Sequence, residues 1–366
     1  MPRFTPARRY ALACVVATAF VAAAADAHAA TQSSGSAGAP PIVVDTDMDF
    51  DDAAALAYLA RADRLGLVDL RAVTVETSGV AFAGRGLSHA RCLLDKLGLG
   101  GVPVADATGA TANNWPDFAR ALLDGIVEQG VRSDPSVPCP DAAGNGDAVE
   151  LLRSAIGSSG RAVTLVTLGP LSAVAEALRQ DSRLAARIER LYVMGGQLDW
   201  SRFGEQFFDA HDYNLWVDAA AAQAVLEALP GRVYMTSNEA AASVPLTEAF
   251  RLRLADDQTT PAAASVYAMA SHPLLVGAEA EHNGGAYWWD PLNAVAATTR
   301  GVVRYEPRRI AIVQSGEHEG RTFTDPDGQL VHYGTSADAD RFHTTFLDIL
   351  NGRLQPPRPA AGSAAT

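Results

Sequence analysis

A short stretch near the start of the sequence concentrates carboxylates. Five aspartates fall within eight residues, and the next basic residue is Arg61. They are Asp45, Asp47, Asp49, Asp51 and Asp52. Two like charges about 4 Å apart repel by roughly 1 kcal/mol in water and about 4 kcal/mol at an effective dielectric constant of 20. A folded chain can hold such a cluster with a bound cation or with raised carboxyl pKa values. Because Ca²⁺ and Mg²⁺ prefer carboxylate oxygens, the stretch predicts a metal site.

Helix capping is the plainer interpretation of the same residues. Asp is favoured at N-caps and in first helical turns, where its charge meets the positive end of the helix dipole. Capping explains Asp51 or Asp52, but it leaves Asp45 and Asp47 unexplained, because both stand at the end of a strand-like run. We therefore favour the metal site over capping alone.

Two other acidic patterns fit poorly. An EF-hand loop that begins at Asp45 would need glycine in place of Phe50. A haloacid-dehalogenase-type phosphotransferase would need Thr or Val in place of Asp49. A Mg²⁺ phosphohydrolase of another kind stays open as an alternative, although the motif loops lack an obvious basic clamp for phosphate.

The acidic stretch lies between a predicted strand at Ile42–Val44 and a helical apolar pattern from Asp52 to Arg64. Further strands are predicted at Leu70–Val75, Val163–Leu168, Leu191–Met194, Val233–Thr236 and Ile310–Val313. Further helices are predicted near His89–Leu97, Asp147–Ile156, Leu171–Leu178, Ala219–Leu229 and Leu292–Thr299. This alternation predicts an α/β fold with a largely parallel central sheet and helices on both faces. In such an open sheet, ligands bind beyond the carboxyl ends of the strands.

The ends of the chain differ from this pattern. Residues 1–30 have the basic start, the apolar run and the small-residue cleavage sites of a signal peptide, which predicts a periplasmic or secreted protein. The apolar run is short for a membrane span, so we expect no membrane association after cleavage. Residues 31–41 predict a flexible linker, 42–354 one catalytic domain, and 355–366 a disordered tail.

Charge and cysteine content narrow the function further. The formal net charge of −13 argues against nucleic-acid polymers as partners, because binding them needs clustered Lys and Arg, but it permits a small neutral substrate. Removal of the signal peptide would take Cys14 and leave Cys92 and Cys139. In an oxidising compartment this pair could form a disulfide, and two buried free thiols are an equal alternative.

Several polar and glycine motifs follow the acidic stretch. They are Leu168-Gly169-Pro170-Leu171, Met194-Gly195-Gly196, Asp212-Tyr213-Asn214 with Asp218, and Trp289-Asp290-Pro291. Together with the Asp-x-Asp-x-x-x-Asp-Asp pattern of residues 45–52, this series resembles the nucleoside hydrolase family over Ile42–Leu350. The resemblance implies that family's Rossmann-like open α/β sheet and the hydrolysis of ribonucleosides to free base and ribose.

The resemblance also implies roles for the matching residues. The Ca²⁺ ligands would be Asp47, Asp52, Asp290 and the backbone carbonyl of Leu168. Asp47 would also be the catalytic base that accepts a proton from the attacking water. The ribose hydroxyls would be bound by Asp51, Asp212, Asn214 and Asp290, with Gln206 at the place where the family commonly has Asn.

These residue types suit the reaction. Cleavage of an N-glycosidic bond develops positive, oxocarbenium-like charge on the sugar, which nearby carboxylates stabilise. A bound Ca²⁺ would hold the attacking water and the 2′- and 3′-hydroxyls in one frame.

The sequence departs from the family's usual pattern in three places. Met48-Asp49 replaces the common Pro-Gly, Asp212 is one methylene shorter than the common Glu, and Val80 stands where many members have a polar residue. These departures motivate an alternative function, in which the chain binds nucleosides or ribose through Ca²⁺ with little turnover.

The residues before Asp290 bear on the choice of base. Many pyrimidine-accepting members have His directly before this Asp, whereas this chain has Trp289. This resembles the purine-preferring branch, in which indole rings stack on the base, and Trp115 is a candidate for the second ring. We therefore expect purine ribonucleosides as preferred substrates. The resemblance further implies a homo-oligomer, a dimer or a tetramer.

Overall fold

The computed structural model describes residues 38–107, 109, 111–133, 139, 146–201, 211–282 and 286–354. The features below belong to the compact unit Ala39–Thr366. The predicted signal peptide, most of the predicted linker, the predicted tail and Gln206 lie outside the described residues. Those predictions therefore stay predictions.

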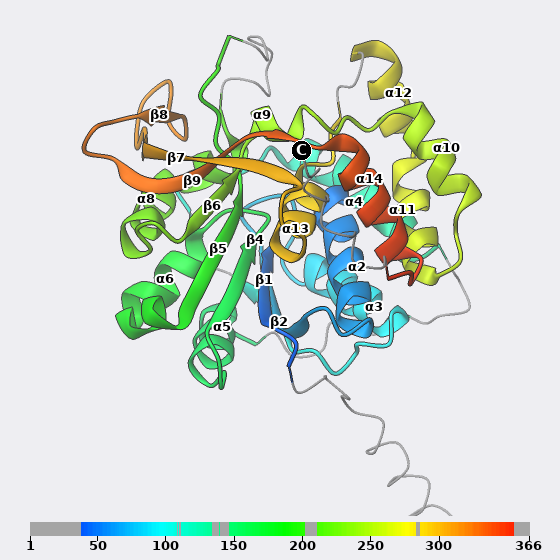
Figure 1. The fold of residues 1–366 in the computed structure, drawn as a ribbon, viewed down its shortest axis with the longest axis horizontal. Coiled ribbons are helices and arrows are strands. Elements are labelled where there is room, and N and C mark those ends of the chain that lie inside the picture. Colours follow the sequence, from blue (N-terminus) through cyan, green and yellow to red (C-terminus); the bar gives the residue numbers. More distant parts are fainter. Residues whose placement is uncertain are drawn as a thin grey trace, which may run out of the picture. The chain divides into compact units, whose positions relative to one another are not determined.

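The described strands form one nine-stranded sheet (Figure 1). Their order is β3 (Val104–Ala107), β2 (Asp69–Glu76), β1 (Pro41–Thr46), β4 (Val163–Thr167), β5 (Ile188–Met194), β6 (Val233–Thr236), β9 (Gln329–Ala337), β7 (Val303–Ile312) and β8 (Thr322–Thr324). Neighbours from β3 to β9 pair in parallel, and β7 runs antiparallel to both β9 and β8. The prediction of a largely parallel sheet is confirmed.

Helices cover both faces of the sheet, as predicted (Figure 1). One face packs against α2 (Phe50–Arg64), α3 (Arg85–Lys96), α4 (Asp117–Val131), α10 (Glu248–Asp256), α11 (Pro261–Ala270), α13 (Trp289–Thr298) and α14 (Ala339–Leu350). The other face packs against α5 (Ala148–Gly157), α6 (Ser172–Gln180) and α8 (Ala219–Ala228), with the 3₁₀ turn η1 (Ser182–Arg187). Strand alternation makes the division, since Val44 belongs to the first core and Val43 to the second.

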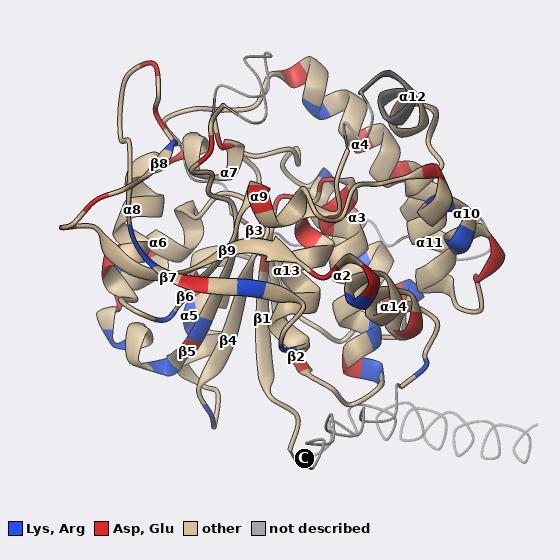
Figure 2. Cartoon of the chain, turned by 45° about the horizontal axis from the view of Figure 1, so that its top comes forward, with Lys and Arg blue, Asp and Glu red and all other residues tan. Residues whose placement is uncertain are grey.

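Three further helices complete the described structure: α7 (Tyr213–Val217), α9 (Asn238–Ala241) and α12 (Pro273–His282). Among the described residues, the structure contains no helix with the length and apolar character needed to cross a membrane. Figure 2 shows basic and acidic residues mixed over the helices on both sides of the sheet.

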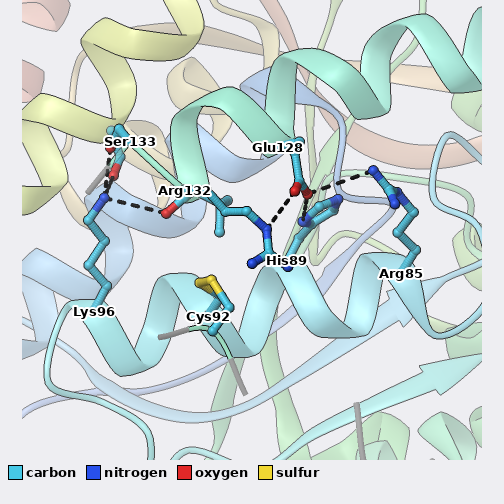
Figure 3. Close-up of a disulfide and its surroundings, with 10 residues drawn as sticks. Arg85, His89, Cys92, Lys96, Glu128, Arg132 and Ser133 are labelled. Carbon is cyan, nitrogen blue, oxygen red and sulfur yellow. Dashed lines mark hydrogen bonds and ion pairs between the residues drawn. A yellow bond between two sulfur atoms is a disulfide. The ribbon is translucent and has the colours of Figure 1, made fainter. Parts of the chain in front are cut away.

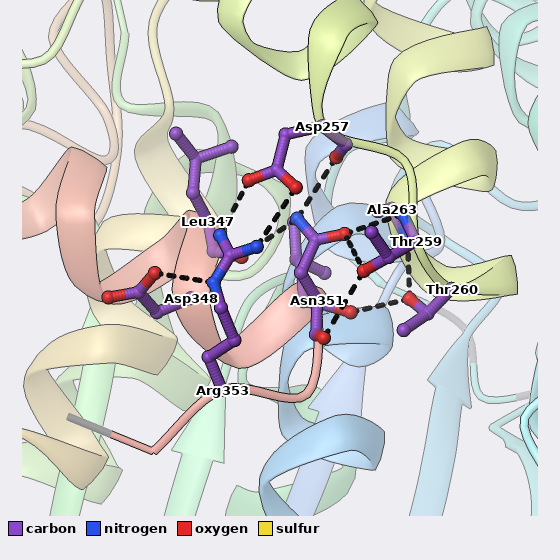
Figure 4. A network of polar contacts seen from close by, with 9 residues as sticks. Asp257, Thr259, Thr260, Ala263, Leu347, Asp348, Asn351 and Arg353 are labelled. Atoms are coloured by element: carbon purple, nitrogen blue, oxygen red, sulfur yellow. Dashed lines mark hydrogen bonds and ion pairs between the residues drawn. The ribbon is translucent and has the colours of Figure 1, made fainter.

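The last described turn of the chain is tied to the loop between α10 and α11 (Figure 4). The Arg353 guanidinium donates to both carboxylate oxygens of Asp257, at 2.9 and 2.5 Å, and to Asp348 at 2.9 Å. Asn351 accepts from the Thr259 amide at 2.8 Å and donates to the Asp257 carbonyl at 3.0 Å. These bonds fix α14 against the helices that lead to α13.

A disulfide joins Cys92 of α3 to Cys139, beyond the end of α4 (Figure 3). This decides between the two alternatives that the sequence left open. The Cα atoms are 4.7 Å apart, within the usual range for this bond. On the same side of α3, His89 Nε2 lies 3.0 Å from Asp124 Oδ1 of α4. The disulfide thus ties α3 to the segment that follows α4, and the polar contact ties α3 to α4 itself.

We expect the disulfide to contribute stability by restricting the unfolded chain. The cysteines are 47 residues apart, for which the chain-entropy relation gives on the order of 4 kcal/mol as an upper limit. Replacing both cysteines with alanine should therefore lower the free energy of unfolding by a few kcal/mol in denaturant titrations. Reductant should destabilise the wild type to a similar extent and leave the variant unchanged. Equal stability of the two proteins without reductant would contradict the expectation.

Candidate active site

The amino-terminal turns of two helices bring three buried carboxylates together. Asp51 and Asp52 lie in the first turn of α2, and Asp290 lies in the first turn of α13. Each offers a carboxylate oxygen, and these oxygens all lie within 4.8 Å of one another. Helices α2 and α13 pack directly against each other beside the carboxyl ends of β1 and β4. The convergence of two helix starts at this edge positions the cluster.

This cluster is electrostatically incomplete. Burial first, and then the charges of neighbouring aspartates, raise the pKa of Asp51 and the pKa of Asp290 well above the ordinary value. Among the described residues no ion pair brings Lys or Arg to the cluster, and Asp290 Oδ1 is buried without a hydrogen-bond partner. An orphaned oxygen among crowded carboxylates is what a hard cation would satisfy. The residues therefore fit a metal ion.

Helix capping explains Asp49 rather than Asp51 or Asp52, the residues for which it was considered. Asp49 is the N-cap of α2, and its side chain accepts from the Phe50 amide. Asp52 instead accepts from the Thr46 hydroxyl and, at 2.9 Å, from the Asp47 amide, which folds the acidic loop back onto the helix start. Met48 completes this loop with a left-handed φ of 52°.

Asp47 lies beside the cluster but has a support of its own. Its Oδ2 accepts from the Val80 amide at 2.9 Å. Burial and the charge of Asp52 raise its pKa. Two glycines leave room for it: a Cβ at Gly79 would meet Asp47 Oδ2 at 1.9 Å, and one at Gly169 would meet Asp47 Cβ at 2.8 Å. The geometry thus groups Asp51, rather than Asp47, with the other two carboxylates, and the assignment of Asp47 as ligand stays a prediction.

Leu168 and Asn214 meet at one carbonyl. The Asn214 side chain donates to the Leu168 carbonyl at 2.6 Å and to the Met194 carbonyl at 3.2 Å. The Leu168 amide donates to the Asp45 carbonyl at 2.8 Å, which fixes the turn after β4 to β1. Asn214 therefore positions the carbonyl that the resemblance assigns to the metal.

Asp212 uses both carboxylate oxygens within the protein. Its Oδ1 caps α7 by accepting from the Leu215 amide at 3.2 Å. Its Oδ2 accepts from the Gly196 amide at 2.6 Å and from the Asn238 side chain at 3.3 Å. Burial raises the pKa of Asp212 to about 6. These bonds give Asp212 a structural role, and its predicted contact with ribose stays a prediction.

The two indole rings that we predicted to stack on the base each have another aromatic neighbour in the protein. Trp115 packs on Tyr213, with ring centroids 4.2 Å apart, and Tyr213 meets Trp216 edge-on. Trp289 is half-buried and meets Tyr287 edge-on at 5.4 Å. The base-stacking roles of Trp115 and Trp289 therefore stay predictions, with Tyr213 as an aromatic neighbour that the sequence reasoning missed.

Comparison with known proteins agrees with this architecture. Residues 42–344 match the model of the inosine-uridine preferring nucleoside hydrolase family. The chain belongs to this family. The resemblance inferred from the motifs is thereby confirmed.

The relatives of this family member differ in their named preferences. The pyrimidine-specific ribonucleoside hydrolase RihA of Klebsiella pneumoniae is 31% identical over 190 residues, 51% of this chain. The match spans 57% of the length of that relative. An inosine-uridine preferring nucleoside hydrolase from Bacillus anthracis covers 85% of this chain and 99% of its own, with 22% identity and a TM-score of 0.70. A purine-preferring ribonucleoside hydrolase from Gardnerella vaginalis covers 85% and 98%, with 21% identity and a TM-score of 0.70. These structures confirm the fold.

Within this nucleoside hydrolase family member, Asn293 is a site-supporting residue that the sequence reasoning missed. It is fully buried one turn after Asp290 on α13. Its amide donates to the carbonyls of Thr167, at 3.1 Å, and Tyr192, at 3.3 Å, and accepts from the Thr236 hydroxyl at 2.8 Å. A lone amide among the apolar residues of Leu292–Ala296 was the available signal. Asn293 therefore ties the helix that carries Asp290 to β4, β5 and β6.

We expect Asn293→Ala to lower the free energy of unfolding by roughly 2–4 kcal/mol, because it leaves buried polar groups without a partner and opens a cavity. Denaturant titration measures this. Gln180→Ala, at an exposed position of α6, is the control and should change stability by less than about 0.5 kcal/mol. A similar small effect at Asn293 would contradict the anchoring role.

Proposed function

We propose that this chain is a Ca²⁺-dependent N-ribohydrolase that converts ribonucleosides to free base and ribose. The observation that carries the proposal is the buried carboxylate cluster of Asp51, Asp52 and Asp290, formed where the family's acidic motifs converge. The cluster needs a cation, and oxygen-only donors suit Ca²⁺. The substrates named for the relatives support ribonucleosides as the substrate class.

The chain's own residues would divide the chemistry among them. Asp52 and Asp290, with the Leu168 carbonyl and Asp47, would hold Ca²⁺. When bound, the ion would fix the ribose hydroxyls and polarise the attacking water. Asp47 Oδ2 accepts the Val80 amide, so Oδ1 is the oxygen that would take the proton from water. The water oxygen bonds to C1′, and the N-glycosidic bond breaks with its electron pair on the base, which takes a proton from solvent.

Removing one negative ligand should separate metal binding from folding. Within the part of the chain that the structure describes, no hydrogen bond to the Asp290 side chain favours its charge, so Asp290→Asn relieves repulsion and should stabilise the metal-free protein. The same change should weaken Ca²⁺ binding at least 100-fold and abolish most base release. Calorimetric Ca²⁺ titration, metal-free melting curves and detection of hypoxanthine released from inosine measure the three effects.

Asp338→Asn is the matched control, because Asp338 caps α14 and lies on a different helix. It should leave Ca²⁺ affinity and base release unchanged. The metal assignment is wrong if wild-type protein exhaustively stripped of metal releases base at the full rate. Tight Ca²⁺ binding by the wild type without base release from any nucleoside would favour the alternative, a binding protein. The commitment of both Asp212 oxygens to the protein's own donors is the observation that favours this alternative.

The position before Asp290 leads us to propose a purine preference. Trp289 cannot donate a proton as an imidazolium can, but it can stack on a base. Stacking contributes on the order of 1–3 kcal/mol per base, and a purine offers the larger face. We expect kcat/KM for inosine to exceed that for uridine at least tenfold, about 1.4 kcal/mol in barrier. Trp289→Ala should narrow the ratio by slowing inosine cleavage. If uridine is the better substrate, as the name of the RihA relatives would favour, the stacking argument is wrong.

A further inference from the structure

The loop after β2 holds the proposed base from one side. The Val80 amide donates to Asp47 Oδ2 at 2.9 Å, and the Ala81 amide donates to the Asp47 carbonyl at 2.8 Å. Gly79 approaches so closely that an added Cβ would lie 1.9 Å from Asp47 Oδ2. The orientation of the Asp47 carboxylate therefore depends on where residues 77–82, which we name the base loop, place their backbone.

A single guanidinium holds the base loop from the other side. Arg120, in the first turns of α4, donates from Nη2 to the Thr77 carbonyl at 2.8 Å and to the Ala81 carbonyl. Its Nε donates to the Val80 carbonyl at 3.2 Å. The same guanidinium lies 4.3 Å from the centre of the Phe82 ring. Four of the six residues of the base loop thus contact one side chain.

Burying the guanidinium of Arg120 costs hydration free energy, which its contacts in the protein must offset. Arg120 is only 8% exposed, and a buried charge needs close polar partners to offset its lost hydration. Its carboxylate partner is Asp117, at 3.4 Å from Nη1, and the side chain of Asp117 is 86% exposed. The carbonyl dipoles of the base loop and the π face of Phe82 therefore stabilise the charge. The planar fork of arginine can satisfy several carbonyls at once, which lysine cannot do.

We propose that Arg120 is a positioning residue for Asp47, acting through the base loop. Val80 is the link, because its carbonyl accepts from Arg120 while its amide donates to Asp47. The proposal rests on the proposed function, in which Asp47 takes the proton from water. Without Arg120 the loop loses its anchor and the Val80 donor is no longer fixed. The chemical step then slows more than nucleoside binding does, since the other site residues stay in place.

Arg120→Gln and Arg120→Lys test the proposal, with Arg132→Gln as the matched control at the opposite end of the same helix. Arg132 pairs with Glu128 at 2.5 Å and is half exposed. For Arg120→Gln we expect kcat with inosine to fall at least tenfold and KM to change less than threefold. Amide hydrogen exchange in residues 78–82 should rise at least tenfold, while exchange within α2 stays protected. Arg120→Lys should lie between this variant and the wild type, and Arg132→Gln should match the wild type in both measurements.

The exchange measurement separates this proposal from the proposed function. If the wild type cleaves no nucleoside, the function fails, while exchange in the base loop still decides whether Arg120 anchors it. Unchanged kcat, or unchanged exchange in residues 78–82, in a folded Arg120→Gln protein overturns the proposal. If kcat falls, KM rises and α2 loses exchange protection to a similar extent, Arg120 is merely structural and the proposal is likewise overturned. If Arg120→Gln does not fold, Arg120→Lys gives the answer by the same two measurements, and Gly79→Ala tests the link between the base loop and Asp47. Gly79→Ala pushes the Asp47 carboxylate aside directly and should reproduce the fall in kcat with little change in KM.

Discussion

Repulsion among the buried aspartates is the constraint to which the surrounding structure responds. Desolvation and mutual repulsion both disfavour charged carboxylates so close together, as the raised pKa values of Asp51 and Asp290 express. Several favourable interactions in the fold offset part of this unfavourable free energy. Two helices direct their positive amino-terminal ends at the cluster, and the Thr46 hydroxyl and backbone amides bind the loop oxygens. These interactions offset only part of the repulsion, and the remainder gives the site its attraction for a cation.

The supports of the site are mostly backbone amides and carbonyls. Val80 stands where many family members have a polar side chain. Its backbone amide still donates to Asp47, and its carbonyl accepts from Arg120. The side chains of Asn214 and Asn293 in turn hold backbone groups in place, because each donates to a carbonyl at the end of β4. The aspartates are thus held by backbone groups, which any residue would supply. The side chains that orient this backbone, in contrast, must be of a particular type.

The sequence was sufficient for the parts of the fold that have regular apolar patterns. The strands at Ile42, Leu70, Val163 and Leu191 were predictable because buried parallel strands form mostly apolar runs. Helix α4 was missed because its pattern is irregular: Phe118 and Leu122 are exposed, at 62% and 51%, while charged Arg120 is buried. Strands β7 and β9 were recognised poorly or not at all, since their exposed faces carry mixed polar residues and their pairing is long-range.

The same limits applied to the site. The clustered aspartates could be found because like charges at short spacing need an explanation within the local sequence. Arg120 and Asn293 could not be assigned, since their partners lie 39 to 43 and 57 to 126 residues away along the chain. Asp212 Oδ2 is occupied by Gly196 and Asn238, which the Asp212-Tyr213-Asn214 motif alone does not bring near. Side-chain roles that require two distant segments are therefore visible only in the folded chain.

The position of β9 in the sheet has a consequence for how the protein is made. β9 pairs with β6 in the interior of the strand order, although almost 100 residues separate the two along the chain. Asp290 likewise joins Asp51 and Asp52 from a distance of more than 200 residues. A chain emerging from the ribosome therefore carries its acidic loop long before it can complete the cluster or close the sheet. The carboxylate cluster can form only after Asp290 has been synthesised and α13 has packed on α2, so metal binding would report that these distant segments have folded together.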